Sequence, residues 1–309
     1  MQLNAHSQVG ARFKLIVRKA CDDSIARETD WFHNLVLDTG LARMSAGTWI
    51  NQCCVGTGNS TPVVTQTALD SFLASTWTQQ SSSAGVQTST TPYYRWAKVT
   101  WRFGQGVAAG NISEVGLGWD NSNLWNRALI KDANGDPTTI TVLSDEYLDV
   151  VSEVRDYLAQ SITGSFNLLD KTGAVISTHT VTGKPVLTGA DVAFFQIIGN
   201  EGNNYGAFNV YSGTMGEAVT ALPSGDLTGD QLSGVTVTYP TSTSIRLVGT
   251  LGLSKANGTH QSFDLMARGL LTTNYSKKRY QFQISPTITK TSSQIMTYTL
   301  EMSWGRYTG

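Results

Sequence analysis

The chain has 309 residues, enough to bury one large core or two cores of ordinary size. Only 15% of the residues are charged and the net charge at pH 7 is −1, so no basic surface for nucleic acid or anionic membranes is expected. The 30 glycines and the abundance of Ser, Thr and Asn favour short strands joined by turns over surface helices.

The first half opens with a predicted strand at residues 12–19, where Phe13, Leu15 and Val17 share one face. The only good helical pattern lies within residues 28–45, and Gly40 could end a short turn there. Ser, Thr and Gln dominate residues 76–93, which we expect to form an exposed loop. Further strands are predicted at residues 49–55, 93–103, 112–119, 126–130 and 138–158.

The second half begins with a predicted hairpin at residues 165–183, turning at Thr172-Gly173, followed by a dense apolar strand at 193–199. After a glycine-rich stretch, four short strands lead to a closing strand near the C-terminus. Its alternate residues share one parity: Met296, Tyr298, Leu300, Met302 and Trp304. We therefore predict an all-β fold of two tandem β-sandwich-like domains, residues 1–158 and 159–309, with one short helix in the first.

The two predicted domains end on similar strands. With a shift of 148 positions, residues 288–304 align with residues 140–156, and four aligned pairs are identical: Ile140/Ile288, Thr141/Thr289, Ser144/Ser292 and Glu153/Glu301. Strands and glycine-rich turns also follow in the same order in each half. We infer a duplicated unit, which different strand orders in the two halves would contradict. Trp304 would then belong to a core or a subunit contact.

No motif in the sequence predicts catalysis, a metal site or a cofactor. The segment DANGDP begins like a calcium loop but has Pro137 and Leu143 where that loop needs Gly and Glu, so a turn at Asn134-Gly135 explains it better. The segment VGTGNST lacks the lysine of a phosphate-binding loop. The acidic pairs Asp145-Glu146 and Glu153/Asp156 are expected to be solvated on an exposed strand face rather than to serve a glycosidase.

The cysteines and the four scattered histidines are equally uninformative about chemistry. Cys53 and Cys54 are adjacent, so they should point to opposite faces of a strand without bridging. Together with Cys21 they predict one buried thiol and one or two exposed ones. The first twenty residues lack the apolar core of a signal peptide, and no run reaches transmembrane length. We expect synthesis in a cytoplasm and no membrane insertion.

Tryptophan is the most informative residue type, because seven of the eight tryptophans lie in the first half. Trp119 and Trp125 flank the polar loop WDNSNLW. Core packing is the ordinary role for such residues, but this position also suits contact with a sugar or with a neighbouring subunit. These two residues are the only candidate binding residues that the sequence offers.

Several segments in order resemble tailed-bacteriophage virion proteins of the tail fibre or tail structural type. They are WFHNLVLDTGLARM, VGTGNSTPVVTQTAL, ISEVGLGW, LWNRALIKDANGDPTTITVLSDEYLDVVSEVR and KTSSQIMTYTLEMSWGRY. The resemblance covers most of residues 30–158 and the last twenty residues. It implies a non-enzymatic virion component, made in the host bacterial cytoplasm, that assembles with copies of itself and with other tail proteins.

Three function hypotheses remain open at this level. The first is a homo-oligomeric tail, baseplate or tail-fibre component that contributes to host attachment. The second is a carbohydrate-binding receptor-recognition module that uses Trp119 or Trp125 on a host surface glycan. The third is a neck, collar or head-decoration protein. A glycan hydrolase is disfavoured, because no pair of catalytic carboxylates can be placed and the repeats of a β-helix are missing.

Overall fold

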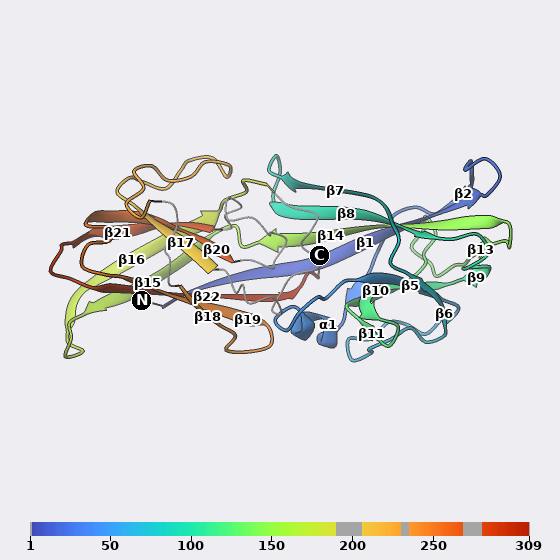
Figure 1. Ribbon diagram of the computed structural model, residues 1–309, viewed down its shortest axis with the longest axis horizontal. Coiled ribbons are helices and arrows are strands. Elements are labelled where there is room, and N and C mark those ends of the chain that lie inside the picture. The colour runs from blue at the N-terminus through green and yellow to red at the C-terminus, as the bar shows by residue number, and fades with distance from the viewer. Residues whose placement is uncertain (1, 190–205, 230–234, 268–279, 309) are drawn as a thin grey trace.

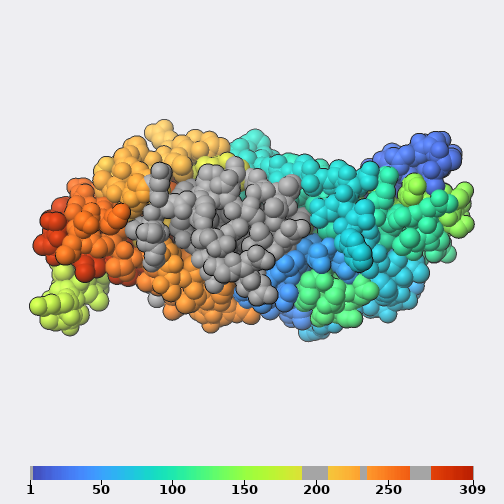
Figure 2. All heavy atoms as spheres, viewed as in Figure 1, coloured from blue at the N-terminus to red at the C-terminus, as the bar shows by residue number. Residues whose placement is uncertain are grey.

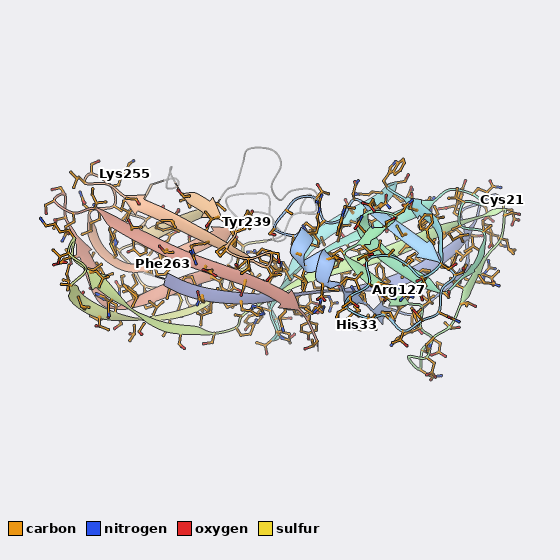
Figure 3. All side chains as sticks on the ribbon, turned by 90° about the horizontal axis from the view of Figure 1, so that it is seen from below. Cys21, His33, Arg127, Tyr239, Lys255 and Phe263 are labelled. Carbon is orange, nitrogen blue, oxygen red and sulfur yellow. The ribbon has the colours of Figure 1, made fainter. Side chains whose placement is uncertain are left out.

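The computed structural model describes residues 2–189, 206–229, 235–267 and 280–308, and the predicted strand at 193–199 lies outside them. The regular secondary structure of the described part is nearly all strand, with α1 (Asp38–Arg43) as its one helix. The all-β class with one short helix is thereby confirmed. The molecule is elongated (Figures 1 and 2), with Cys21 near one end of its long axis and Lys255 near the other (Figure 3).

A nine-stranded sheet of the described residues, called here the long sheet, extends through both halves of the molecule (Figure 1). Its strands in spatial order are β18 (Thr236–Thr238), β19 (Ser244–Leu251), β22 (Met296–Arg306), β1 (Gln2–Lys19), β14 (Glu146–Leu158), β8 (Tyr94–Phe103) and β7 (Gln79–Gln87), and β2 (Ile25–Glu28) and β3 (Phe32–His33) also pair with β1. Strand β1 pairs antiparallel with β14 over residues 7–19 and parallel with β22 over residues 2–9. One strand thus pairs with the closing strands of both halves.

Each half adds a second sheet, which gives the sandwich-like arrangement. In the first half, the described strands of the second sheet are, in spatial order, β4 (Leu35–Val36), β12 (Asn126–Leu129), β10 (Glu114–Asp120), β5 (Gln52–Gly56) and β6 (Phe72–Thr76), and β11 (Asn123–Leu124) also pairs with β10. Strands β13 (Ile140–Val142) and β9 (Gly110–Ile112) form a separate two-stranded sheet. In the second half, the described strands of the second sheet are, in spatial order, β15 (Ile162–Leu169), β16 (Val175–Pro185), β21 (Tyr280–Lys290), β20 (Gly258–Ala267) and β17 (Gly206–Tyr211).

The core lies between the sheets and includes residues of both halves in one apolar cluster. Alternation sets which side chains enter it, since every second residue of β8 is buried. In the second half, the Phe208 and Phe263 rings lie 5.3 and 5.7 Å from the Tyr298 ring of β22. Trp304, on the same strand, is 3% exposed, and its Nε1 donates to Leu41 O of α1 at 2.9 Å. The prediction that Trp304 belongs to a core is confirmed.

The two halves repeat part of their strand order, as the duplication hypothesis requires. In the long sheet, β14-β8-β7 corresponds to β22-β19-β18, and in the second sheets β12-β10-β5 corresponds to β21-β20-β17. The halves differ beside the closing strand. Strand β14 pairs with β1, but β22 pairs with the start of the same β1 rather than with β15. The predicted boundary between residues 158 and 159 stays a prediction.

Two local predictions are wrong. The helix is only six residues long because residues 32–36 form β3 and β4, which pair with β1 and β12. Gly40 lies inside α1 and does not end it. A Cβ there would lie 2.2 Å from the backbone oxygen of Trp125, so the close approach of two backbones requires glycine. Residues 79–87, predicted as a loop, form the edge strand β7, which has a polar and largely exposed surface.

Other local predictions are confirmed in part or in full. Gly135 and Gly173 have φ of +86° and +87°, as the turns predicted at these glycines require. Cys53 and Cys54 are both buried, one more than predicted, and they belong to different apolar clusters on opposite faces of β5. Burial raises the pKa of the Cys54 thiol to about 11, which keeps it protonated at neutral pH.

Candidate functional site

The structure separates the two tryptophans that the sequence offers as binding residues. Trp125 is fully buried, and its ring centroid lies 5.0 Å from that of Trp49. It packs in the core and has no surface for a glycan or a subunit, which corrects the prediction for this residue. Trp119 is partly exposed, and the Arg43 guanidinium lies 5.1 Å from its ring centroid. A contact role for Trp119 stays a prediction.

A different group of aromatic residues lies on the outward face of the long sheet, over β1, β14 and β8. Because alternate side chains of each strand point away from the core, aromatic and charged residues of neighbouring strands meet there. We call this surface the aromatic–ionic face. It consists of Arg12, Arg18, Trp31, Tyr94, Trp96, Lys98, Arg102, Tyr147, Asp149, Glu153 and Arg155.

Glu153 is one of two carboxylates at the centre of this face. Arg12 donates to it through Nε at 3.0 Å, Arg155 donates through Nη2 at 2.6 Å, and Lys98 Nζ lies 3.3 Å away. Burial raises the pKa of the Glu153 carboxyl, but hydrogen bonds from Arg12 and Arg155 outweigh burial and leave the pKa below its ordinary value. A lowered pKa is the opposite of what a general acid needs, so Glu153 is suited to an ion pair.

The second carboxylate, Asp149, occupies the equivalent place four residues earlier on β14. Arg18 donates to it through Nε at 2.8 Å, and Arg102 donates through Nε and Nη2 at 2.7 and 2.8 Å. Both carboxylates are buried, as are Glu146 and Asp156, whereas Asp145 is exposed. The expectation that the acidic pairs are solvated is therefore wrong for Glu146, Glu153 and Asp156.

The cations of this face also lie over its aromatic rings. The Arg12 guanidinium is 4.4 Å from the Trp31 ring centroid, and Lys98 Nζ is 5.5 Å from that of Trp96. The Arg155 guanidinium is 4.6 Å from the ring of Tyr94. Cation–π contacts of this kind hold flat rings and charged groups in fixed positions. The side chains of this face therefore hold one another in place.

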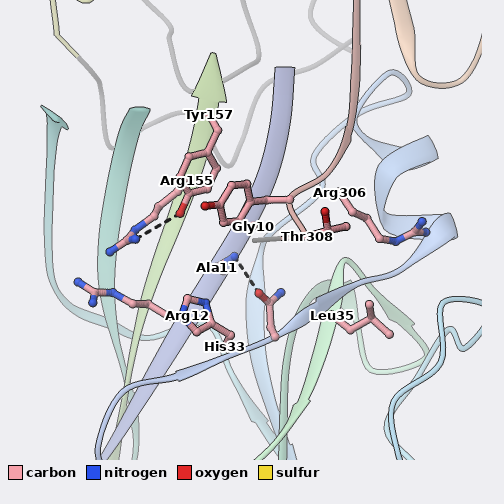
Figure 4. Close-up of a pocket in the computed structure, with 11 residues that line it drawn as sticks. Gly10, Ala11, Arg12, His33, Leu35, Arg155, Tyr157, Arg306 and Thr308 are labelled. Atoms are coloured by element: carbon pink, nitrogen blue, oxygen red, sulfur yellow. Dashed lines mark hydrogen bonds between the residues drawn. The ribbon is translucent and has the colours of Figure 1, made fainter. Parts of the chain in front are cut away.

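A cavity of about 290 Å³ adjoins this face where β1, the segment after β3 and the C-terminal segment meet (Figure 4). We call it the junction cavity. Tyr157 and Tyr307 form part of its wall, with stacked rings 3.7 Å apart at 11°. Gly10 permits this stack, because a Cβ there would lie 3.3 Å from Tyr307 Cβ. The remaining described residues of its wall are Ala11, Arg12, His33, Asn34, Leu35, Arg155, Arg306 and Thr308.

Other candidate sites from the sequence are closed by the protein itself. In the glycine-rich loop after β5, the Glu114 carboxylate accepts from the backbone N–H of Gly58 at 2.9 Å, so this loop does not present its amides to a phosphate. In DANGDP, Asp132 accepts from the backbone N–H groups of Asn134 and Asp136. Among the described residues, no group of three His, Cys, Asp or Glu side chains is arranged to hold a metal ion.

Both the aromatic–ionic face and the junction cavity were missed from the sequence. Alternation in β8 and β14 predicts which side chains point outward, but Arg12 meets Glu153 from 141 positions away. Tyr307 reaches Gly10 from even farther along the chain. One sequence signal for the aromatic–ionic face was available: Tyr94, Trp96 and Lys98 alternate with the core residues of β8 and therefore share its outward face.

Comparison with known proteins adds little. No family model matches the chain, and no curated protein matches it. One solved structure, a candidate outer membrane protein of Bacteroides fragilis, aligns with this chain at 8% sequence identity and a TM-score of 0.16. The alignment covers 81% of this chain and 99% of that protein's chain. A score this low carries no structural argument. In the described part of the chain, no helix has the length and apolar character needed to cross a membrane.

Proposed function

We propose that this protein is a non-enzymatic structural component of a tailed-phage virion. It is a tail, baseplate or tail-fibre protein that assembles with copies of itself and contributes to host attachment. The observation that carries the proposal is the long sheet, which joins both halves through one shared strand. An elongated molecule of this kind suits a part that bears load in an assembled particle. The resemblance of its segments to tail proteins supports the same conclusion.

Exposed apolar residues near both ends of the molecule support self-assembly. Ile25 of β2 and Leu143, which directly follows β13, are 52% and 50% exposed and line one surface hollow at the end of the molecule where these strands lie (Figure 1). Ile176 of β16 and Ile295, which directly precedes β22, are 61% and 65% exposed and line a second hollow in the other half. Exposed apolar groups mark interaction surfaces when they gather in patches. Contacts between the two different ends would be head-to-tail, and such contacts produce rings or open filaments.

Native mass spectrometry of the full chain tests self-assembly, and mass spectrometry of purified phage particles tests incorporation. We expect an oligomer whose mass falls to that of the monomer in the variant Ile176→Lys/Ile295→Lys. Val63→Lys is the matched control, because Val63 is 51% exposed and belongs to neither end group. A stable wild-type monomer that is absent from purified particles contradicts the proposal.

A second candidate function is recognition of a host glycan, favoured by the partly exposed Trp119 beside Arg43. Phage particles that carry Trp119→Ala should then adsorb more slowly to host cells, while Trp77→Ala, at a residue 73% exposed outside the aromatic–ionic face, should not change adsorption. Equal adsorption of both variants would count against Trp119. A neck, collar or head-decoration role is separated from a tail role by a density map of the whole particle.

A further inference from the structure

The junction cavity combines features that ordinary packing does not need. Its described wall contains three arginines, a histidine and two tyrosines, and none of the described wall residues is an aspartate or a glutamate. Its volume, about 290 Å³, lies near the lower limit of ligand pockets, which is roughly 300 Å³. A ligand of the size of one sugar ring would fill it.

The charge around the cavity is not balanced. Arg306 pairs with Asp38 of α1, and Figure 4 shows its head directed toward the helix, so Arg306 contributes little positive charge to the cavity. On the other side, Arg12, Arg155 and Lys98 share the single carboxylate of Glu153. Three cations against one carboxylate leave two positive charges in that group, beside a wall made of the described residues with no carboxylate of its own.

The histidine in the wall responds to this field. His33 is exposed, yet partial desolvation of its imidazole, and then the positive charges of Arg155, Arg12 and Lys131, lower the pKa of this ring. Arg155 lies on β14, Arg12 lies on β1, and Lys131 follows β12. A negative ligand beside His33 would relieve this repulsion, so its binding would raise the same pKa.

Polar donors and an aromatic surface complete the cavity. Arg155 Nη1 donates to the Tyr157 hydroxyl at 3.2 Å, which leaves the hydroxyl hydrogen of Tyr157 free to be donated onward. Asn34 Oδ1 accepts from Ala11 N at 2.8 Å, while the buried Asn34 Nδ2 has no acceptor among the described residues. Tyr307 is only partly buried beyond its stack on Tyr157, and an exposed tyrosine ring is a surface on which sugar rings pack.

We propose that the junction cavity binds a monosaccharide unit that carries a carboxylate, such as a hexuronic acid. The carboxylate lies toward Arg12, Arg155 and His33, and the ring hydroxyls face the tyrosine hydroxyls and the Asn34 side chain. Cations and planar guanidinium groups match a carboxylate, whereas the hydroxyl partners and the tyrosine ring match the sugar. This inference goes beyond the proposed function, because it holds wherever the protein lies in a particle.

Titration of the full-length protein with glucuronic acid, glucose and inorganic sulfate, followed by NMR chemical shifts, tests the inference. We expect glucuronic acid to bind at least tenfold more tightly than glucose or sulfate and to shift the side-chain signals of His33 and Asn34. Equal binding of glucose would remove the role of the arginines. Equal binding of sulfate would show that the cavity is a general anion site. Each of these two results overturns the proposal, and so does the absence of glucuronic acid binding.

Variants connect the binding to the cavity. Arg12→Gln and His33→Ala should each weaken glucuronic acid binding at least fivefold. Lys14→Gln is the matched control, since Lys14 lies on the same face of β1, pairs with Glu28 and is not part of the wall. Arg12→Gln leaves Glu153 paired with Arg155 and Lys98, and His33 is exposed, so both variants should melt as the wild type does. Equal affinities in all three variants contradict the assignment.

Discussion

At the scale of single residues, a fully enclosed ion pair joins Arg127 of β12 to Glu114 of β10. Both side chains have zero exposure, and Arg127 Nε donates to Glu114 at 2.8 Å. The same carboxylate accepts from the backbone N–H groups of Gly58, Asp70 and Ser71, while Arg127 also donates to the Asp70 carboxylate at 2.8 Å. One ion pair thus holds both ends of the loop that connects β5 to β6.

Replacing Glu114 with glutamine should lower the free energy of unfolding by about 3–5 kcal/mol, because it leaves a buried guanidinium without its main counter-charge. The comparison is Glu28→Gln, which breaks an exposed pair with Lys14 and should cost about 0–1 kcal/mol. Urea unfolding of both variants measures the difference. Equal losses would show that burial does not set the strength of these pairs.

His260 should make stability depend on pH. Its Nε2 lies 2.7 Å from Ala256 O and must donate to it, so in the neutral ring Nδ1 accepts from the Tyr298 hydroxyl at 2.7 Å. Burial, with repulsion from Lys290, lowers the pKa of His260 below its unfolded value of about 6.5. As the pH falls, the unfolded state therefore binds more protons than the folded state. The stability that neutral His260 contributes to the folded state is fully present above about pH 6.5 and is lost as the pH falls toward the folded pKa.

Unfolding free energies at pH 7.5 and 5.5 check this direction. The wild type should lose stability between the two values, and His260→Gln should lose less, since glutamine does not titrate. A steeper loss in the variant than in the wild type would contradict the assignment of this pH dependence to His260.

Residues also show where sequence reasoning stops. Alternation predicts that Trp96 and Trp101 lie on opposite faces of β8, and they do, because a strand sets the direction of its own side chains. It cannot predict that Glu153, on the outward side of β14, is buried, since the arginine that covers it belongs to β1. The junction cavity escapes for the same reason, as Gly10, His33 and Tyr307 have no local pattern in common.

At the scale of elements, β22 occupies an interior place in the long sheet, between β19 and β1. Its alternate residues, predicted to share one parity, are buried along the whole strand. Removing it would leave one edge of β19 and the first residues of β1 without a hydrogen-bonding partner, and would open the core beneath Tyr298 and Trp304.

Deletion of residues 296–309 should therefore abolish folding of the second half rather than trim a loose end. Limited proteolysis and thermal melting of the truncated protein measure this. Deletion of residues 308–309 is the control, since it leaves β22 intact and should melt as the full chain does. Soluble truncated protein that melts cooperatively would contradict the prediction.

The short helix and the edge strand show how tertiary contacts override local preference. Residues 32–36 have apolar spacing compatible with a helix, but pairing with β1 and β12 satisfies their backbone groups in strands instead. Residues 79–87 are polar and were predicted as a loop, yet pairing with β8 makes them a strand. A polar edge strand carries little sequence signal, because neither of its faces is deeply buried.

At the scale of the whole molecule, the two halves should unfold together. They share β1, and residues of both halves belong to one apolar cluster. Neither half can lose its structure without exposing core or unpairing strands of the other. Differential scanning calorimetry should show a single transition whose calorimetric and van't Hoff enthalpies agree. Two separate transitions would favour independent domains divided near residues 158 and 159.

The parallel pairing of β1 with β22 also determines how the molecule would respond to mechanical force. Eight residue pairs join the two strands, from Gln2 with Thr299 to Val9 with Arg306. Tension applied between residue 2 and residue 306 pulls these strands past each other along their length. All of the hydrogen bonds between them are then loaded in shear at once and cannot open one after another, so the strand that joins the two halves also resists their being pulled apart.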